Sequence, residues 1–382
     1  MANILFMMWP EPGHINPTLR IAKTLKSHGH KVFYAQLGDF EDYIRAEGLE
    51  FVPFFGELLP TGYQVRQNYS VSIYGDLAVL CDQLARMHDK NIYDFIKEVL
   101  GTIFEKVKPD LLLMDSYNGK FFERFIPVDD PPCILINPTV VVPRHNGNVT
   151  SKLTTLILCP EEFEVEQQNL PANYHHVEAS CDMQRKVKPG FPWDRIDGNK
   201  KLLYCSLGTQ GQWQHEGADY EAKQQSGLRF LQAVVDAMAG RPDWQLVMVV
   251  GHISAEALHS VPANAVLVEF APQSEILKRA SLSINHGGLN TVKDCILLGV
   301  PMLVFPVIGD QFGSAERVAF HKLGLVSDQR TASAESISSM ITTIEHDPGI
   351  KSRVEAMQKV FLQKERESPS VKIIEDRLAE RI

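Results

Sequence analysis

The sequence has 382 residues, of which 44% are hydrophobic, and a formal net charge of −9. This length suits two domains, and the composition is that of a globular protein with sizeable cores. The acidic balance argues against nucleic-acid binding, which usually needs a basic surface.

The first residues, MANILFMMWPEPGH, lack a basic region and are interrupted by Pro10, so we expect a first strand and no signal peptide. No run approaches the ~20 apolar residues that a membrane-spanning helix needs. The six cysteines form no C-x-x-C pair, which indicates neither a zinc site nor a redox motif. Cys133 and Cys205 lie inside apolar runs and are expected in the core. Unpaired thiols agree with a cytoplasmic location.

Short apolar runs alternate with helical patterns in both halves of the chain. Continuous apolar strands are typical of parallel sheets whose two faces are covered by helices. The sequence therefore predicts an α/β protein with two doubly wound domains. The expected strands span residues 3–9, 30–36, 49–54, 110–116 and 132–138 in the first half, and 201–208, 244–251, 265–270, 281–285 and 300–306 in the second.

A stretch rich in Pro, Gly and charge, residues 183–201, separates the two series and has the composition of a linker. We place the domain boundary near residue 190. Ligands of open parallel sheets bind beyond the carboxyl ends of the strands, so two such domains face to face would form a cleft.

Several helix ends carry recognisable signals. Asn16 and Pro17 are expected as N-cap and first residue of a helix that stops at Gly29. A second helix, beginning near Asn290, should end at Gly299. The sequence SAES at 333–336 resembles a capping box, with Ser in place of the usual Glu or Gln.

The junction NHGGLNT, residues 285–291, lies between an apolar strand and a helix. A helix N-terminus presents unpaired N–H groups and roughly half a positive charge, which suits an anion such as phosphate. His286, Asn290 and Thr291 add side-chain donors, and SLGTQG at 206–211 offers a second such loop, so that the two could hold a diphosphate. The alternative is that the two glycines only form a tight turn.

The wider stretch 270–318 closely resembles the donor-binding signature of nucleotide-sugar-dependent glycosyltransferases with the GT-B fold, in particular the plant and bacterial natural-product enzymes. The resemblance lies in APQ, HGG-N, the acidic residue at 294, GVPM, the acidic-Gln pair at 310–311 and AERV. Weaker similarity extends over GHINPTL, PDLLLMDS and YCSLGT. It implies two Rossmann-like domains facing across a cleft, with the acceptor in the first (1–190), the donor in the second (191–365), and a final helix (366–382) returning to the first.

The resemblance also implies roles for individual residues of the donor site. Phe270, where the family usually has Trp, would stack on the nucleobase, and Gln273 would bind the base or ribose. Asp294, where the family usually has Glu, would accept from ribose hydroxyls, and the choice between uridine and thymidine stays open. Leu289 replaces the Trp of plant members. The diphosphate would be held by Thr209, His286, Gly288, Asn290 and Thr291, and the sugar hydroxyls by Asp310 and Gln311.

His14 lies after the first strand and just before the expected helix. From position alone it is either a capping or surface residue or a catalytic one. The resemblance implies that it is the general base, which takes a proton from the acceptor hydroxyl. Asp115 stands at the matching position for a carboxylate that orients the imidazole, although a strand-end cap is the alternative. Asp110 is a fallback that should lie at the opposite end of the sheet.

The implied activity is inverting transfer of a hexose or deoxyhexose from a UDP- or dTDP-sugar to a hydroxyl. The sequence has no DxD pattern, so no metal site is expected, and no cofactor is implied besides the nucleotide sugar. The stretch 51–95 is rich in aromatic and apolar residues, which would supply walls for a small apolar or aromatic acceptor. Alternatively these residues are plain core.

Other functions compete with this one. A sugar-nucleotide epimerase on the same fold would bind the donor without an acceptor. A catalytically silent GT-B auxiliary protein would bind nucleotide and activate another enzyme. A dinucleotide oxidoreductase is disfavoured, because no GxGxxG follows a strand. The sequence does not distinguish a monomer from a homodimer.

Overall fold

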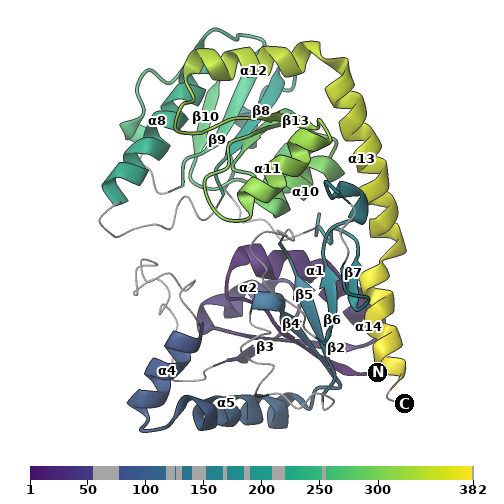
Figure 1. The fold of residues 1–382 in the computed structure, drawn as a ribbon. Coiled ribbons are helices and arrows are strands. Elements are labelled where there is room, and N and C mark those ends of the chain that lie inside the picture. The colour runs from purple at the N-terminus through teal and green to yellow at the C-terminus, as the bar shows by residue number, and fades with distance from the viewer. Residues whose placement is uncertain are drawn as a thin grey trace.

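The computed structural model describes residues 1–54, 77–117, 125, 131–139, 152–166, 170–184, 190–208, 220–251 and 255–380. Within these ranges the chain forms two α/β units, one above the other in Figure 1, and a long helical segment runs beside both. The predicted α/β architecture with two parallel sheets is confirmed.

The strands of the first sheet lie within about one to two residues of the predicted runs. Burial of hydrophobic residues on both faces explains why these runs contain little alternation. The strands are β1 (Asn3–Met7), β2 (Lys31–Gln36), β3 (Glu50–Pro53), β4 (Leu111–Asp115), β5 (Cys133–Asn137), β6 (Thr154–Ile157) and β7 (Tyr174–His176). The helices are α1 (Pro12–Ser27), η1 (Gly38–Phe40), α2 (Glu41–Ala46), α4 (Leu77–Met87), α5 (Ile92–Val107) and η4 (Glu161–Phe163).

The second sheet follows after η5 (Trp193–Arg195). Its strands are β8 (Lys201–Ser206), β9 (Trp244–Val249), β10 (Ala265–Val268), β11 (Ala280–Asn285), β12 (Met302–Val304) and β13 (Gly324–Val326). Its helices are α8 (Tyr220–Ala239), η6 (Ala255–Ala257), α9 (Gln273–Leu277), α10 (Leu289–Leu297), α11 (Gln311–Phe320) and α12 (Ala334–His346), followed by α13 (Pro348–Glu367) and α14 (Pro369–Ala379).

Strand order places a topological switch point in each sheet. The first sheet has the order β3-β2-β1-β4-β5-β6-β7 and the second β10-β9-β8-β11-β12-β13, with every pair parallel. The order therefore reverses between β1 and β4 in one sheet and between β8 and β11 in the other. Ligands of doubly wound folds bind beyond the carboxyl ends of such strand pairs, where His14, Asp115 and the HGGLNT junction follow their strands.

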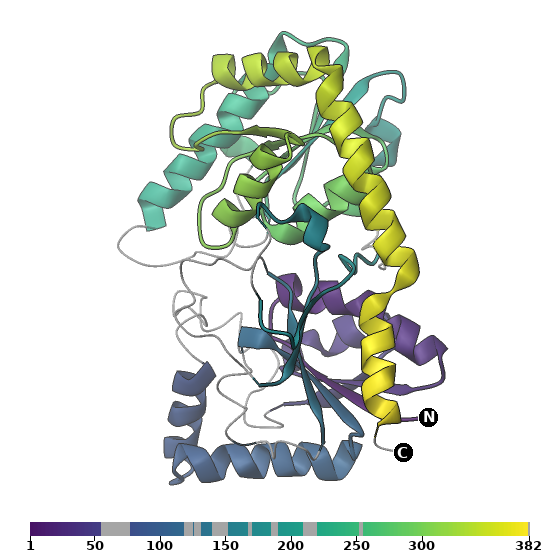
Figure 2. The same ribbon diagram turned by 45° about the vertical axis from the view of Figure 1, so that its right-hand side comes forward.

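Each sheet has its own hydrophobic core, but the two units share chain segments. The second core includes Cys159, Phe163 and Ala179, which precede the predicted boundary near residue 190. The first core includes Val371 and Ile374 of α14. Figure 2 shows α13 and α14 running along the side of both units.

The start of α1 differs from the prediction. The helix begins at Pro12, with Glu11 in an extended conformation as N-cap, and Pro17 lies inside it. Both prolines carry the signal of a first helical residue, and the earlier one begins the helix. The Asn16 side chain accepts a hydrogen bond from the Tyr43 hydroxyl and does not cap a helix. His14 consequently lies in the first turn of α1 and not in a preceding loop.

Other predicted helix ends agree with the structure. Gly29 and Gly299 adopt positive φ directly after the C-cap residues of α1 and α10. Ser333 and Ser336 form a capping box at the start of α12, so Ser serves in place of Glu at the third helical position. The short strands β6, β7 and β13 were not predicted, because each has only three or four residues and β7 is polar.

The six cysteines all lie in the described ranges and form no disulfide with one another, and Cys133 and Cys205 are buried as predicted. No helix in the described ranges is both long and apolar enough to cross a lipid bilayer.

Candidate active site

His14 and Asp115 meet at the switch point of the first sheet. His14 Nδ1 lies 2.7 Å from Asp115 Oδ2. The histidine is 8% exposed and the aspartate is fully buried. Pairing of β1 with β4, which sets Met7 beside Met114, brings these two residues together at one edge of the sheet. With Nδ1 bound to the carboxylate, Nε2 is the ring atom left for a substrate.

The Asp115 carboxylate is held by the backbone around it. Its Oδ1 accepts from the Tyr117 N–H at 2.9 Å, and its Oδ2 accepts from the Trp9 N–H at 3.4 Å. These bonds restrict the carboxylate and leave it oriented toward His14. Asp115 is therefore more than a strand-end cap, although it also serves that purpose.

Several charges act on His14. Burial lowers the pKa of its imidazole, but attraction and hydrogen bonding to Asp115, together with the charges of Glu11 and Asp310, outweigh this, and the pKa is raised above its ordinary value. Asp310 belongs to the second unit, so the two units face each other at this point. Burial also raises the pKa of Asp310, and His14 opposes that shift.

Asp110 is excluded as the orienting carboxylate. Its Oδ2 accepts from the Asn3 N–H at 2.8 Å, at the amino end of β1. This is the opposite edge of the sheet from His14, as the strand direction predicts.

Tyr117 is a neighbour of His14 that was not predicted from the sequence. Its ring stands edge-on to the His14 ring, with centroids 5.3 Å apart, and it is 56% exposed. Partial burial, and after it the negative charges of Asp310, Asp115 and Glu11, raise the pKa of its hydroxyl. Its only sequence signal is its position two residues after Asp115.

The second switch point brings together β8 and β11, and His286 occupies it. A Cβ on Gly208 would lie 2.3 Å from His286 Cε1, and one on Gly288 would lie 2.5 Å from His286 Nε2. Both glycines are thus required by the imidazole ring that packs against them. Burial lowers the pKa of His286 to about 4, so its ring is neutral at pH 7.

Gly287 serves the turn itself. It has a φ of +80°, and a Cβ there would lie 2.9 Å from the Gln311 carbonyl oxygen. The tight-turn alternative therefore holds for Gly287. Gly288 is the N-cap of α10 and has no side chain to cover the first N–H groups of that helix.

Two further predicted donor residues are in contact with each other. Gln273 Nε2 donates to Asp294 Oδ2 over 2.7 Å. Thr291 and Asp294 are both buried on α10. Phe270 follows β10 and is 54% exposed, as a residue that stacks on a ligand would be.

Asp310 and Gln311 stand at the start of α11. Gln311 is buried, and its Oε1 accepts from the backbone N–H groups of Val307 at 2.8 Å and Ile308 at 3.0 Å. Its side-chain carbonyl oxygen thus holds its own loop, and its predicted contact with a sugar stays a prediction.

Asn290 contacts the other unit. Its Nδ2 donates to the carbonyl oxygen of Gly13, next to His14, over 2.7 Å. Thr209 lies outside the described residues, so its predicted role stays a prediction.

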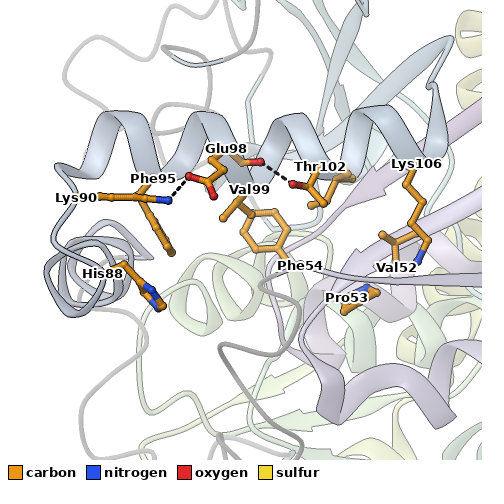
Figure 3. Close-up of a pocket in the computed structure, with 11 residues that line it drawn as sticks. Val52, Pro53, Phe54, His88, Lys90, Phe95, Glu98, Val99, Thr102 and Lys106 are labelled. Atoms are coloured by element: carbon orange, nitrogen blue, oxygen red, sulfur yellow. Dashed lines mark hydrogen bonds and ion pairs between the residues drawn. The ribbon is translucent and has the colours of Figure 1, made fainter.

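A cavity of about 270 Å³ lies elsewhere in the first unit, between the edge strand β3 and α5. Figure 3 shows Phe54 and Val99 among its lining residues, together with the Lys90–Glu98 ion pair. Several lining residues belong to the stretch 51–95 that was predicted to form acceptor walls. None of them is a predicted catalytic or donor residue, and part of that stretch, 55–76, lies outside the described residues.

Known proteins are similar to this chain in sequence and in fold. Residues 232–375 match the family model described as "Erythromycin biosynthesis protein CIII-like, C-terminal domain". The zeaxanthin glucosyltransferase of Pantoea ananas is 39% identical, over 88% of this chain and 88% of its own length. The NDP-glycosyltransferase YjiC of Bacillus subtilis (strain 168) is 26% identical, over 92% of this chain and 91% of its own.

A solved structure described as the glycotransferase of kitacinnamycin superposes with a TM-score of 0.72. It is 21% identical and covers 98% of this chain and 99% of its own. The likeness at this identity concerns the fold, which matches in both units.

Proposed function

We propose a reaction for this chain on the premise that it belongs to the nucleotide-sugar-dependent glycosyltransferases of the natural-product type with the GT-B fold. The protein transfers a hexose or deoxyhexose, with inversion, from a UDP- or dTDP-sugar to a hydroxyl of an apolar acceptor. His14 is the general base of this reaction. The donor binds at the second switch point and the acceptor in the first unit.

The His14–Asp115 pair carries this proposal. A buried carboxylate 2.7 Å from Nδ1 keeps the proton on Nδ1, so that Nε2 is a lone-pair acceptor, and it stabilises the imidazolium that forms. Nε2 takes the hydroxyl proton as the acceptor oxygen bonds to the anomeric carbon. The bond from that carbon to the diphosphate oxygen breaks at the same time, on the opposite face, which inverts the configuration.

The leaving diphosphate needs stabilisation of its developing charge. The N-terminus of α10 supplies backbone N–H groups and a favourable dipole, and Gly288 leaves them uncovered. Gln273 and Asp294, already bonded to each other, would bind the nucleoside. Asp310 and Gln311 Nε2 would bind sugar hydroxyls beside His14.

The acceptor class rests on composition and on one relative. The first unit contains the apolar and aromatic stretch 51–95, and the 39% identical relative acts on zeaxanthin, according to its name. We therefore propose an apolar alcohol as the acceptor and zeaxanthin as the first compound to test. The proposed reaction needs no metal, since the sequence has no DxD pattern.

The experiment measures transfer from UDP-glucose and dTDP-glucose to zeaxanthin, with excess chelator present, and determines the anomeric configuration of the product by NMR. We expect a β-linked product from these α-linked donors. The variant His14→Ala should lose roughly 10²–10⁴ in kcat, the usual contribution of a general base. Its affinity for UDP and dTDP, measured by calorimetry, should stay close to that of the wild type.

Transfer by His14→Ala at the wild-type rate would refute the role of His14. Retention of configuration would refute the single displacement. Conversion of the donor without any acceptor would indicate an epimerase instead.

A further inference from the structure

Pro17 leaves a gap in the hydrogen bonding of α1. In an α-helix the N–H of each residue donates to the carbonyl four residues earlier. Proline has no N–H, so residue 17 cannot donate to the carbonyl of Gly13. This carbonyl belongs to the residue directly before His14, in the first turn of the helix. The helix therefore does not hold the turn that carries the proposed base as firmly as the rest of its length.

Asn290 supplies a donor to this same carbonyl from the second unit. It is the second residue of α10, at the proposed diphosphate site. Its Nδ2 lies 2.7 Å from Gly13 O. Its Oδ1 is buried and has no hydrogen-bond partner among the described residues, so the Gly13 bond is what orients this amide.

The Asn290 side chain thus connects the proposed diphosphate site to the turn that carries His14. A primary amide has two N–H donors, so Asn290 can keep one on Gly13 and turn the other to a phosphate oxygen. Binding of the diphosphate would then order the turn that carries His14. Displacement of a catalytic group by about 1 Å can cost on the order of 100-fold in rate. A contact that positions His14 can therefore change the rate of transfer measurably.

We propose that Asn290 is a positioning residue, which holds the Gly13 carbonyl left open by Pro17 and thereby sets His14 against the bound donor. The inference rests on the proposed function, because it assumes that His14 is the base. It differs from a plain phosphate-binding role for Asn290, which would act on donor affinity and would be indifferent to Pro17.

The test is a double-mutant cycle between Asn290→Ala and Pro17→Ala. Alanine at 17 supplies the missing N–H, so the helix itself holds Gly13. Pro12→Ala is the matched control: it is the same change in the same helix, but Pro12 is the first helical residue, whose N–H would have no partner within the helix. For each protein we would measure kcat, the Kd of UDP and dTDP by calorimetry, and the free energy of unfolding in urea.

Asn290→Ala should lower kcat roughly tenfold to 100-fold while the nucleotide Kd changes much less. When Asn290→Ala is added to Pro17→Ala, the factor by which kcat falls should be less than about a third of the factor seen in the wild-type background. When it is added to Pro12→Ala, kcat should fall by the same factor as in the wild-type background. The unfolding free energies of Asn290→Ala and Pro17→Ala should likewise be non-additive.

Two results would overturn the proposal. One is a loss from Asn290→Ala that resides in Kd and KM with kcat unchanged. The other is the same loss in kcat with proline or alanine at 17. Absence of transfer by the wild-type protein would instead refute the proposed function, whereas additive unfolding free energies would refute the interdomain bond itself, whatever the activity.

Discussion

His14 lies under opposing influences whose balance sets the pH range of the reaction. Burial lowers its pKa, and Asp115, Glu11 and Asp310 raise it, with a net upward shift. The proposed general base would act in its neutral form, so we expect the reaction to require a pH above this raised value. The acid limb of kcat/KM, which reports the free enzyme, should therefore lie above pH ~6.5, the ordinary value for histidine.

Replacement of Asp115 by Asn tests this balance. The variant removes the negative charge while keeping the shape, so the pKa of His14 should fall and the acid limb should move to lower pH. The plateau should also drop by roughly 10²–10⁴, because the amide no longer stabilises the imidazolium or fixes the tautomer. The measurement is kcat/KM against pH from 5 to 9, at constant ionic strength.

Glu11→Gln is the control for this prediction. The negative charge of Glu11 helps to raise the pKa of the His14 imidazole, so the neutral variant should move the acid limb in the same direction but by less, with the plateau kept. An acid limb that stays in place in both variants would mean that another group controls the profile.

Individual residues were predictable here to the extent that their roles depend on sequence neighbours. His14 and Asp115 follow two strands whose carboxyl ends share an edge, so their meeting could be expected once the sheet was. The packing of the His286 ring against Gly208 and Gly288 could not be predicted, because Gly208 lies in a different strand–helix junction. Gly288 was predicted to hold the diphosphate, and the structure shows in addition that it and Gly208 make room for the His286 imidazole.

The starts and ends of helices were predicted correctly where the sequence offered only one local signal. The end of α10 at Gly299 and the capping box of α12 at Ser333 were each marked by a single signal in the sequence. The start of α1 had two prolines with the same signal, and composition could not rank them. That error matters for function, because it hid both the position of His14 in a helical turn and the unusual position of Pro17.

The loop before α11 depends on one side chain. Gln311 Oε1 accepts from the N–H groups of Val307 and Ile308. Gln311→Ala should leave both groups without this partner and lower the free energy of unfolding by about 1–3 kcal/mol. It should also raise the KM for the sugar donor, because Asp310 loses its support. Urea unfolding and donor saturation kinetics measure the two effects.

Gln311→Glu separates loop support from sugar binding. A carboxylate still accepts from both N–H groups but lacks the Nε2 donor, so stability should be retained while the KM for the donor rises. Equal loss of stability in both variants would show that Oε1 does not hold the loop. A donor KM unchanged in Gln311→Glu would remove Nε2 from the sugar site.

At the scale of the whole molecule, the two units are joined by more than the linker. The segment after β6 packs Phe163 into the second core, and Lys293 of α10 reaches the Leu158 carbonyl at 3.1 Å. Arg20 of α1 bonds Glu365 of α13, whose pKa burial raises to about 6. The resemblance implied a final helix that returns to the first domain, and Val371 and Ile374 do lie in the first core. The packing of residues 158–163 against the second unit was not predicted, because contacts between distant residues leave no local pattern.

The buried pair Arg317–Glu164 is the strongest test of this joining. Both side chains are almost fully buried, and they connect α11 to the segment that follows β6. Arg317 Nη1 also donates to the Gly313 carbonyl at 2.9 Å.

Removal of one partner leaves the other charge buried, so Arg317→Met and Glu164→Gln should each cost roughly 3–5 kcal/mol of unfolding free energy. Because the charge left behind causes most of this cost, the double variant should cost clearly less than the sum. Arg330→Ala, which breaks an exposed pair with Asp328, is the control and should leave the urea midpoint unchanged. Additive costs in the double variant would mean that the two side chains stabilise their own units separately and do not join them.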